Sequence, residues 1–136
     1  MNLNSEMQEK LIKTAVEARK SSYSPYSHYA VGAALLTRSG RIYDGTNIEN
    51  AAFPVTVCAE RVAIFKAVSE GERDFEAIAV VTGNAGTPCG SCRQVMAEFS
   101  LDMLVLIADA QGNLQRTMTV AELLPGAFIP NDLQPE

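Results

Sequence analysis

The residues best suited to chemistry lie in two short motifs of this 136-residue chain. One motif contains Cys58 followed two positions later by Glu60, and the other contains Cys89 and Cys92, which completes the set of three cysteines. Zinc is held by thiolate, imidazole or carboxylate ligands, and a catalytic zinc site uses three of them so that water can occupy the fourth position. The three thiols therefore predict a catalytic metal site with one ion per chain.

The spacing of the cysteines indicates how they can meet. Cys89 and Cys92 are three residues apart at an expected helix start, so both sulfurs can lie on one face of that helix. Cys58 must then come from the start of a second helix whose N-terminus converges on the first. Unpaired backbone N–H groups and the helix dipole stabilise thiolates at such helix starts. We therefore expect a metal site between two helix N-termini.

Charged residues beside the cysteines suggest how the site works. Side chains in the first turn of a helix tilt toward its N-terminus, so Cys58 and Glu60 can project into the same space. We interpret the thiol as a metal ligand and Glu60 as the carboxylate that handles protons of the attacking water. Three thiolates around Zn²⁺ leave a net negative charge, and we expect Arg61 and Arg93 to compensate by donating hydrogen bonds to the sulfurs.

Hydrophobic periodicity predicts helices and strands in alternation around these motifs. Ser5 and Gln8 have the spacing of a capping box at the first helix. The expected elements are helices at 5–22, 58–70, 89–100 and 121–125, and strands at 29–37, 41–48, 75–82, 103–109 and 114–120. Alternation of this kind indicates a three-layer α/β/α sandwich with a mixed sheet of about five strands, formed by a single domain at 1–136.

Charge and hydropathy exclude other classes of protein. The net charge is -5, and no cluster of Lys and Arg offers a surface for phosphates, so we expect no nucleic-acid partner. The longest apolar stretches are far shorter than the roughly 20 residues that cross a bilayer, so we expect no membrane span. The polar, acidic N-terminal sequence does not resemble a secretory signal, and we expect a cytoplasmic protein whose cysteines stay reduced.

Five motifs in order resemble those of the small homotetrameric, zinc-dependent cytidine deaminases. They are PYSHYAVGAALLT, GTNIENAAFP, CAER, PCGSCRQV and ELLPGAF, which together span nearly the whole chain. The resemblance implies hydrolytic deamination of cytidine and 2'-deoxycytidine to uridine and 2'-deoxyuridine with release of ammonia. In that chemistry zinc-activated hydroxide attacks C4 of the pyrimidine and Glu60 is the proton shuttle.

The same resemblance implies roles for residues outside the two cysteine motifs. It places the ribose hydroxyls on Asn47 and Glu49, and the backbone of Ala59 against the base. Tyr29 is expected to pack on the pyrimidine, and Phe128 to do so from a neighbouring subunit of a homotetramer.

The chain departs from the family pattern at three places. Tyr29 replaces the usual phenylalanine, so its hydroxyl needs a partner or solvent, and the segment 83–87 is shorter than usual. Thr46 stands where cysteine is common. His28, the single histidine, is interpreted as a surface or structural residue because the cysteines already complete the ligand set.

Two other functions remain open at this point. The chain could deaminate another small base or an aminonucleoside. It could instead be a non-catalytic interaction domain stabilised by zinc, although structural zinc normally has four protein ligands and only three are visible. Taken alone, Cys89 and Cys92 could also form a redox dithiol. The position of Cys58 with Glu60 favours the metal site.

Overall fold

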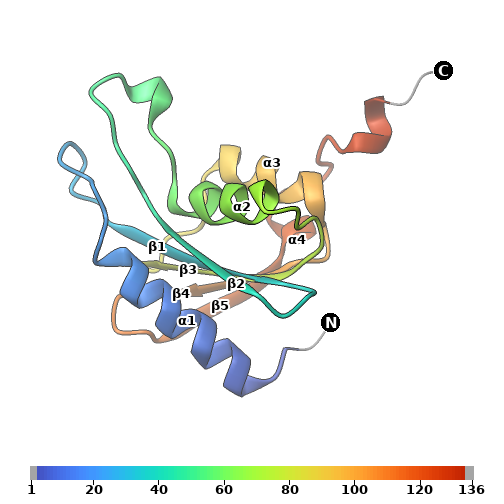
Figure 1. Ribbon diagram of the computed structural model, residues 1–136, viewed down its shortest axis with the longest axis horizontal. Coiled ribbons are helices and arrows are strands. Elements are labelled where there is room, and N and C mark those ends of the chain that lie inside the picture. Colours follow the sequence, from blue (N-terminus) through green and yellow to red (C-terminus); the bar gives the residue numbers. More distant parts are fainter. Residues whose placement is uncertain (1–2, 134–136) are drawn as a thin grey trace.

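A mixed five-stranded sheet is the centre of the fold, and helices cover both of its faces (Figure 1). The structure is a computed structural model that describes residues 3–133. The strands are β1 (Val31–Thr37), β2 (Ile42–Thr46), β3 (Phe75–Thr82), β4 (Leu104–Ala108) and β5 (Leu114–Thr119). The helices are α1 (Ser5–Arg19), α2 (Ala59–Ser69), α3 (Gly90–Phe99) and α4 (Val120–Leu123), with 3-10 turns at Phe53–Val55 and Pro130–Leu133.

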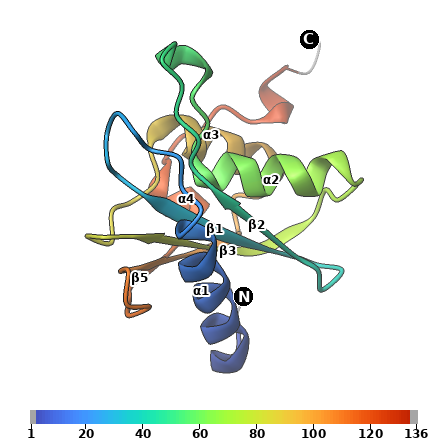
Figure 2. The ribbon, with the colours of Figure 1, turned by 60° about the vertical axis from the view of Figure 1, so that its left-hand side comes forward.

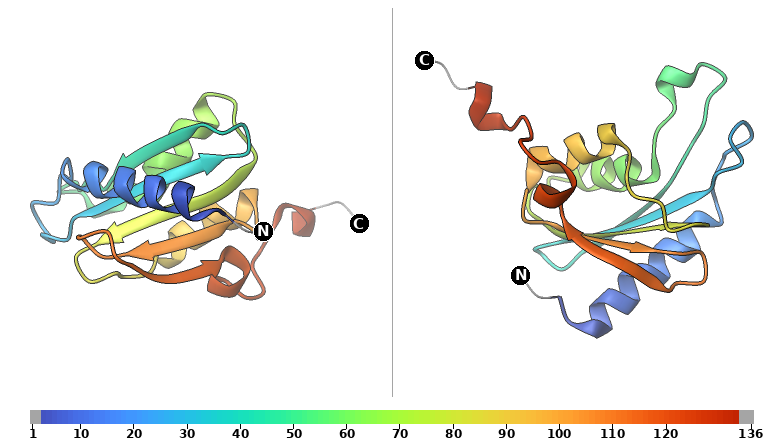
Figure 3. Two further views of the ribbon diagram at one scale, coloured as in Figure 1. Left: turned by 90° about the horizontal axis from the view of Figure 1, so that it is seen from below. Right: turned by 180° about the vertical axis from the view of Figure 1, so that it is seen from behind.

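The strand order brings the two cysteine motifs to the same side of the sheet. The order is β2-β1-β3-β4-β5, and β3 and β4 are parallel whereas the other neighbouring pairs are antiparallel. A parallel pair requires a crossover connection, and here that connection contains α3. Figures 1 and 3 show α3 beside α2 on one face and α1 on the other. The predicted three-layer α/β/α arrangement and mixed sheet are therefore confirmed.

The sheet is buried on both faces, which explains its nearly continuous apolar strands. On one face, Ala33, Ile78 and Val80 belong to the core cluster that includes the inner sides of α2 and α3. On the other face, Ala34 and Val81 belong to the cluster that includes α1. Alternate residues of one strand thus serve different cores, as the pleat of a strand requires.

Two glycines allow the helices to lie directly on the sheet. A Cβ atom on Gly32 would come within 2.0 Å of the Ala15 carbonyl oxygen of α1. On the opposite face, a Cβ atom on Gly45 would lie 2.5 Å from the Ala59 oxygen of α2. Contacts this short are not tolerated, so both positions require glycine. The second contact fixes the height of the α2 N-terminus above the sheet.

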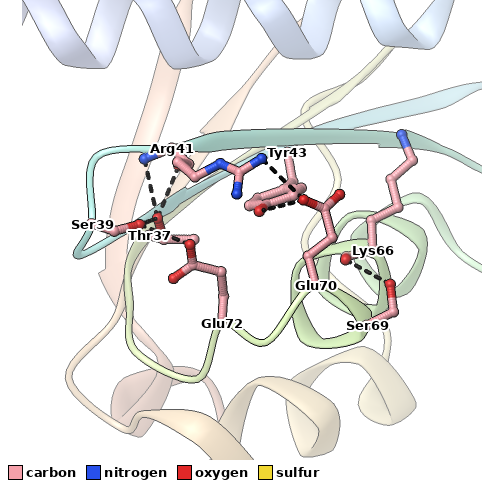
Figure 4. A network of polar contacts seen from close by, with 8 residues as sticks. All are labelled: Thr37, Ser39, Arg41, Tyr43, Lys66, Ser69, Glu70 and Glu72. Carbon is pink, nitrogen blue, oxygen red and sulfur yellow. Dashed lines mark hydrogen bonds and ion pairs between the residues drawn. The ribbon is translucent and has the colours of Figure 1, made fainter.

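A polar network holds the far end of α2 against the β1–β2 hairpin (Figure 4). Arg41 Nη2 lies 3.0 Å from Glu70 Oε1, and the Tyr43 hydroxyl donates to the same oxygen at 3.2 Å. Ser39 Oγ donates to Glu72 at 2.8 Å. Exposed ion pairs contribute little individually, about 0–1 kcal/mol, but this network joins the hairpin turn to the helix C-terminus.

Several predicted element boundaries were too wide. The first two strands are shorter at the ends that carry Tyr29 and Asn47, because these residues lie in connections beyond the sheet. The first helix is capped by Asn4, whose Oδ1 accepts from Met7 N at 2.8 Å, and not by Ser5 as expected. The 3-10 turns were not predicted. Among residues 3–133, no helix is long and apolar enough to cross a membrane.

Two connections extend beyond the same end of the sheet, near the N-terminus of α2 (Figure 2). They join α1 to β1 and β2 to α2. Isolated bridges link Tyr23 to Ile48 and Ile48 to Val57, so the two connections support each other. They form one side of the cavity described below.

Candidate metal centre and active site

The three cysteine sulfurs meet between the N-termini of α2 and α3. Cys58 and Cys89 are the residues immediately before these helices, and Cys92 lies in the first turn of α3. The Sγ atoms of Cys58 and Cys89 are 3.8 Å apart, and those of Cys89 and Cys92 are 3.5 Å apart. All three ligand atoms lie within 4.8 Å of one another. The expected convergence of two helix starts is present.

This cluster has the donor chemistry and dimensions of a zinc site. Zn–S bonds of about 2.3 Å in a tetrahedron place sulfurs about 3.8 Å apart. The observed separations of 3.8 and 3.5 Å fit this spacing with little adjustment. Cys92 is buried, Cys58 is half-buried and Cys89 is exposed. Three thiolates leave one position of the tetrahedron for a further ligand.

Glu60 lies in the first turn of α2, two residues after Cys58, and is only 4% exposed. Burial, together with the neighbouring Cys58, raises the pKa of its carboxyl to about 7. Glu60 shares the lining of one cavity with Cys58 and Cys89. A buried carboxyl beside the three sulfurs is placed to exchange protons with a molecule in that cavity.

The cavity has a volume of about 440 Å³, within the usual range for small-molecule sites. Its wall contains Cys58, Cys89 and Glu60 together with Tyr29, Asn47 and Glu49. A larger hollow of about 590 Å³ lies on the α1 face and is lined by residues of α1 and of the β4–β5 connection. The cavity beside the cysteines is the candidate active site, although it is the smaller of the two, because Cys58, Cys89 and the buried Glu60 line it.

Arg61 makes the contact with sulfur that the sequence suggested. Its Nη2 donates to Cys58 Sγ at 3.4 Å, whereas its buried Nε has no hydrogen-bond partner among the described residues. Hydrogen bonds from Cys92 and Arg61 lower the pKa of the Cys58 thiol to about 5. The pKa of Cys92 is raised because it donates to Cys58 and is buried. Cys58 is therefore the more acidic thiol of this pair.

Arg93 does not make the contact we expected. Its Nε donates to Pro88 O at 2.7 Å, its Nη1 to Leu123 O at 2.7 Å and its Nη2 to Thr87 Oγ1 at 2.9 Å. These oxygens are better acceptors than a sulfur, and they lie within reach of the guanidinium. Arg93 therefore ties the segment before Cys89 to the end of α4.

Asn47 is fixed by the segment before β1. Its Oδ1 accepts from Val31 N at 3.0 Å and from Ser22 Oγ at 2.6 Å, and its Nδ2 donates to Tyr29 O at 2.7 Å. One N–H of the amide group is left to donate elsewhere. Asn47 is buried and lines the cavity.

Glu49 is held by the same connection. Its Oε1 accepts from the backbone N–H groups of Tyr26 at 3.0 Å and Ser27 at 3.1 Å, and its Oε2 accepts from the Ser27 hydroxyl. The Ser27 hydroxyl is the main cause of a lowered pKa, so the carboxylate stays charged. A fixed, charged acceptor and an amide donor thus line the same cavity.

The other residues singled out in the sequence differ in their exposure and in their distance along the chain from the cysteine motifs. Tyr29 lines the cavity and is 41% exposed. Ala59 is fully buried as the first residue of α2, between two residues that line the cavity. Phe128 is 56% exposed in the C-terminal segment, and its carbonyl accepts from Gln94. His28 adopts a positive φ of 57° beside Ser27.

Sequence reasoning did not find several residues of the cavity wall. Thr82 at the end of β3 and Gly86 and Thr87 in the following connection line the cavity, as do Ser27 and Thr56. The glycine-rich sequence after β3 indicated a loop but gave no sign of the surface it faces. These residues face the cavity because of the way distant segments pack together, which no local sequence pattern indicates.

Comparison with known proteins agrees with this geometry. The family model described as the cytidine and deoxycytidylate deaminase zinc-binding region matches residues 5–108. A cytidine deaminase of Sporosarcina psychrophila is 54% identical, with 92% of this chain and 93% of the relative covered. A cytidine deaminase of Halalkalibacterium halodurans is also 54% identical, with 90% of this chain and 95% of the relative covered.

A solved structure gives the same result for the fold. The crystal structure of cytidine deaminase from Burkholderia pseudomallei has a TM-score of 0.84 and 42% sequence identity, and the match covers 93% of this chain and all of that one. The chain therefore belongs to the cytidine and deoxycytidylate deaminase zinc-binding family. Its three-cysteine cluster is consistent with the zinc site of that family, one ion per chain.

Proposed function

We propose that this protein hydrolytically deaminates cytidine and 2'-deoxycytidine to uridine and 2'-deoxyuridine, releasing ammonia in pyrimidine salvage. The observation that carries the proposal is that one cavity is bordered by Cys58 and Cys89 of the three-sulfur cluster and by the buried carboxyl of Glu60. Relatives named cytidine deaminase, at 54% identity over almost the whole chain, support the same substrate.

The sulfurs and Glu60 divide the chemistry between them. When bound, zinc would polarise a water molecule and lower its pKa at the position that the three thiolates leave open. Glu60 takes one proton from the attacking water and delivers it to N3 of the pyrimidine, and then takes the second proton from the hydroxyl on C4 and delivers it to the departing amino nitrogen. The water oxygen becomes bonded to C4, the C4–N bond breaks, and ammonia leaves. Burial of Glu60 limits proton exchange with bulk water.

The far part of the cavity binds the sugar and the ring. Asn47 donates to one ribose hydroxyl and Glu49 accepts from another, because both side chains are already oriented by the segment before β1. The Tyr29 ring packs on the pyrimidine, which adds affinity for a flat ring at low entropic cost. The Ala59 backbone lies against the base.

We extend the proposal to assembly and location. Phe128 completes the pocket of a neighbouring chain in a homotetramer. The apolar side chains left exposed on one chain support an association of this kind; they include Phe53, Val55, Phe65, Phe128 and Leu133. Residues 1–136 act as one deaminase domain in the cytoplasm, where the ligand thiols stay reduced.

The direct test is loss of the ultraviolet absorbance of cytidine on addition of the protein, with zinc quantified in the same sample. Deamination of cytidine with about one zinc per chain supports the proposal. One zinc per chain without deamination of any pyrimidine nucleoside would instead identify a zinc-stabilised interaction domain. Activity on an aminonucleoside but not on cytidine would identify a deaminase of different specificity.

A further inference from the structure

We propose that the hydrogen bond between the Tyr29 hydroxyl and the Asn84 side chain, here called the latch, holds the connection between β3 and α3 in place. The latch thereby positions Cys89 at the end of this connection. Tyr29 Oη donates a hydrogen bond to Asn84 Oδ1 at 2.8 Å. The two residues are 55 positions apart and come from the connections before β1 and after β3. The bond therefore joins two separate sides of the cavity.

The latch continues into the backbone of the β3–α3 connection. Asn84 Oδ1 also accepts from Thr82 Oγ1 at 3.2 Å, and Thr82 Oγ1 accepts from Gly86 N at 2.7 Å. A Cβ atom on Gly86 would lie 2.5 Å from the Tyr29 hydroxyl oxygen. The loop backbone thus lies directly against this hydroxyl, and three hydrogen bonds connect Tyr29 to Gly86.

The connection adopts a conformation that needs such support. Ala85 has a φ of 55°, in the left-handed region that residues with a Cβ atom adopt at a cost. Arg93 holds the other half of the connection through Thr87 Oγ1 and Pro88 O. The latch and Arg93 therefore secure the two halves of the segment that leads to Cys89.

The position of Cys89 depends on this segment more than that of the other ligands. Cys92 is buried within α3 and Cys58 is half-buried before α2, whereas Cys89 is exposed at the end of the connection. Gly86 and Thr87 of the same connection line the cavity. Tyr29 is thus a positioning residue through its hydroxyl, in addition to the contact that its ring makes under the proposed function.

The test compares the zinc-loaded protein with Tyr29→Phe, Asn84→Ala, the double variant and Asn84→Asp. Tyr29→Phe keeps the ring and removes only the donor, and Asn84→Asp keeps an acceptor oxygen. Tyr43→Phe is the matched control, because it removes a hydroxyl bonded to Glu70 at the far end of α2. We measure zinc release to a coloured chelator, together with KM and kcat for cytidine.

We expect Tyr29→Phe and Asn84→Ala each to speed zinc release and raise KM by about twofold to tenfold, the effect of one hydrogen bond between neutral groups. The double variant should show no more than Asn84→Ala alone, since Asn84→Ala already removes the bond from Tyr29 together with the bond from Thr82. Asn84→Asp should restore release to that of the unmodified protein. The kcat value should change less, because the latch does not contact Glu60.

Two results would overturn the latch. One is that the Tyr29 and Asn84 effects multiply in the double variant, and the other is that Tyr29→Phe releases zinc no faster than Tyr43→Phe. The measurements of KM and kcat rest on the proposed function, whereas the measurement of zinc release does not. A protein that fails to deaminate cytidine but loses zinc faster without the hydroxyl would refute that function and keep the latch.

Discussion

Glu60 is the residue on which the proposed proton transfers depend. Its carboxyl is buried beside the cysteines but is not needed to complete the three-sulfur cluster. We expect Glu60→Gln to retain zinc and to lower kcat by about 10²- to 10⁴-fold, the usual contribution of a general acid or base. The cytidine absorbance assay and metal analysis of the same preparation measure the two effects. Turnover close to that of the unmodified protein would remove Glu60 from the mechanism.

Arg61 compensates the negative charge of the sulfur cluster. Its guanidinium donates to Cys58 Sγ at 3.4 Å, and three thiolates around a divalent ion carry a net charge of about -1. We expect Arg61→Ala to lower zinc retention or activity severalfold, measured by dialysis against a chelator and by the deamination assay. Arg38, an exposed arginine in the hairpin, is the control position. Equal effects of Arg61→Ala and Arg38→Ala would show that charge compensation is unimportant.

At the scale of elements, the N-terminus of α2 is the critical part because it carries both Cys58 and Glu60. Gly45 of β2 sets its position, since an added Cβ atom would lie 2.5 Å from Ala59 O and 2.7 Å from Ala63 N. We expect Gly45→Ala to displace this helix, with an unfolding free energy lower by about 1–3 kcal/mol, as in overpacked cores. Urea denaturation measures the loss of stability, and zinc content reports the displacement.

Gly83→Ala is the matched control for this change. A Cβ atom at Gly83 meets only Arg19 Nη2, at an ordinary contact distance of 3.5 Å. If both alanine variants unfold at the same urea concentration, close packing of α2 on Gly45 does not determine its position.

The β4–β5 turn gives the fold a pH dependence. Asp109 accepts from the backbone N–H groups of Asn113 at 2.9 Å and Gln111 at 3.0 Å, and the bond from Asn113 is the main cause of its lowered pKa. A group whose pKa is lower in the folded state stabilises the protein at pH values above its unfolded-state pKa. This stabilisation is lost as the pH falls through its folded-state pKa. The ionised Asp109 therefore stabilises this turn at neutral pH.

We expect Asp109→Asn to lower the urea midpoint at pH 7, and this difference to shrink once the pH falls below the ordinary value of 3.8. Urea midpoints measured from pH 7 to pH 3 test the expectation. Asp102→Asn is the control, because the described hydrogen bond of Asp102 uses only its backbone N–H. A difference for Asp109→Asn that is constant over this range would contradict the assignment.

The sequence predicted those parts of the molecule that depend on local pattern. The convergence of Cys58, Cys89 and Cys92 was predictable because their spacing reflects two helix starts. Arg93 was assigned wrongly because adjacency to Cys92 says nothing about which acceptor lies nearest in the folded chain. The bond between Tyr29 and Asn84 joins residues 55 positions apart, so no local pattern could reveal it.

At the scale of the whole molecule, the C-terminal segment extends away from the sheet (Figures 1 and 3). Phe128 is 56% exposed there, which suits contact with another chain under the proposed assembly. We expect Phe128→Ala to raise KM. Co-expression of Phe128→Ala chains with Glu60→Gln chains should then give more activity than the two variants assayed separately, because Glu60→Gln chains supply an intact Phe128 to pockets that retain Glu60.

The oligomeric state is measured on the same samples by size-exclusion chromatography. An active monomer, or a mixture no more active than the sum of its parts, would show that each pocket is complete within one chain.

The separation of the metal ligands links metal supply to folding. Cys58 and Cys89 are 31 positions apart, on opposite sides of β3 in the sequence, and they meet only when α3 crosses over between β3 and β4. An unfolded chain can offer the nearby Cys89 and Cys92 to a metal but must close a long loop to add the third sulfur. Zinc therefore binds the native chain preferentially and raises its thermal stability, so a zinc-starved cell would lose the protein through unfolding as well as through idle active sites.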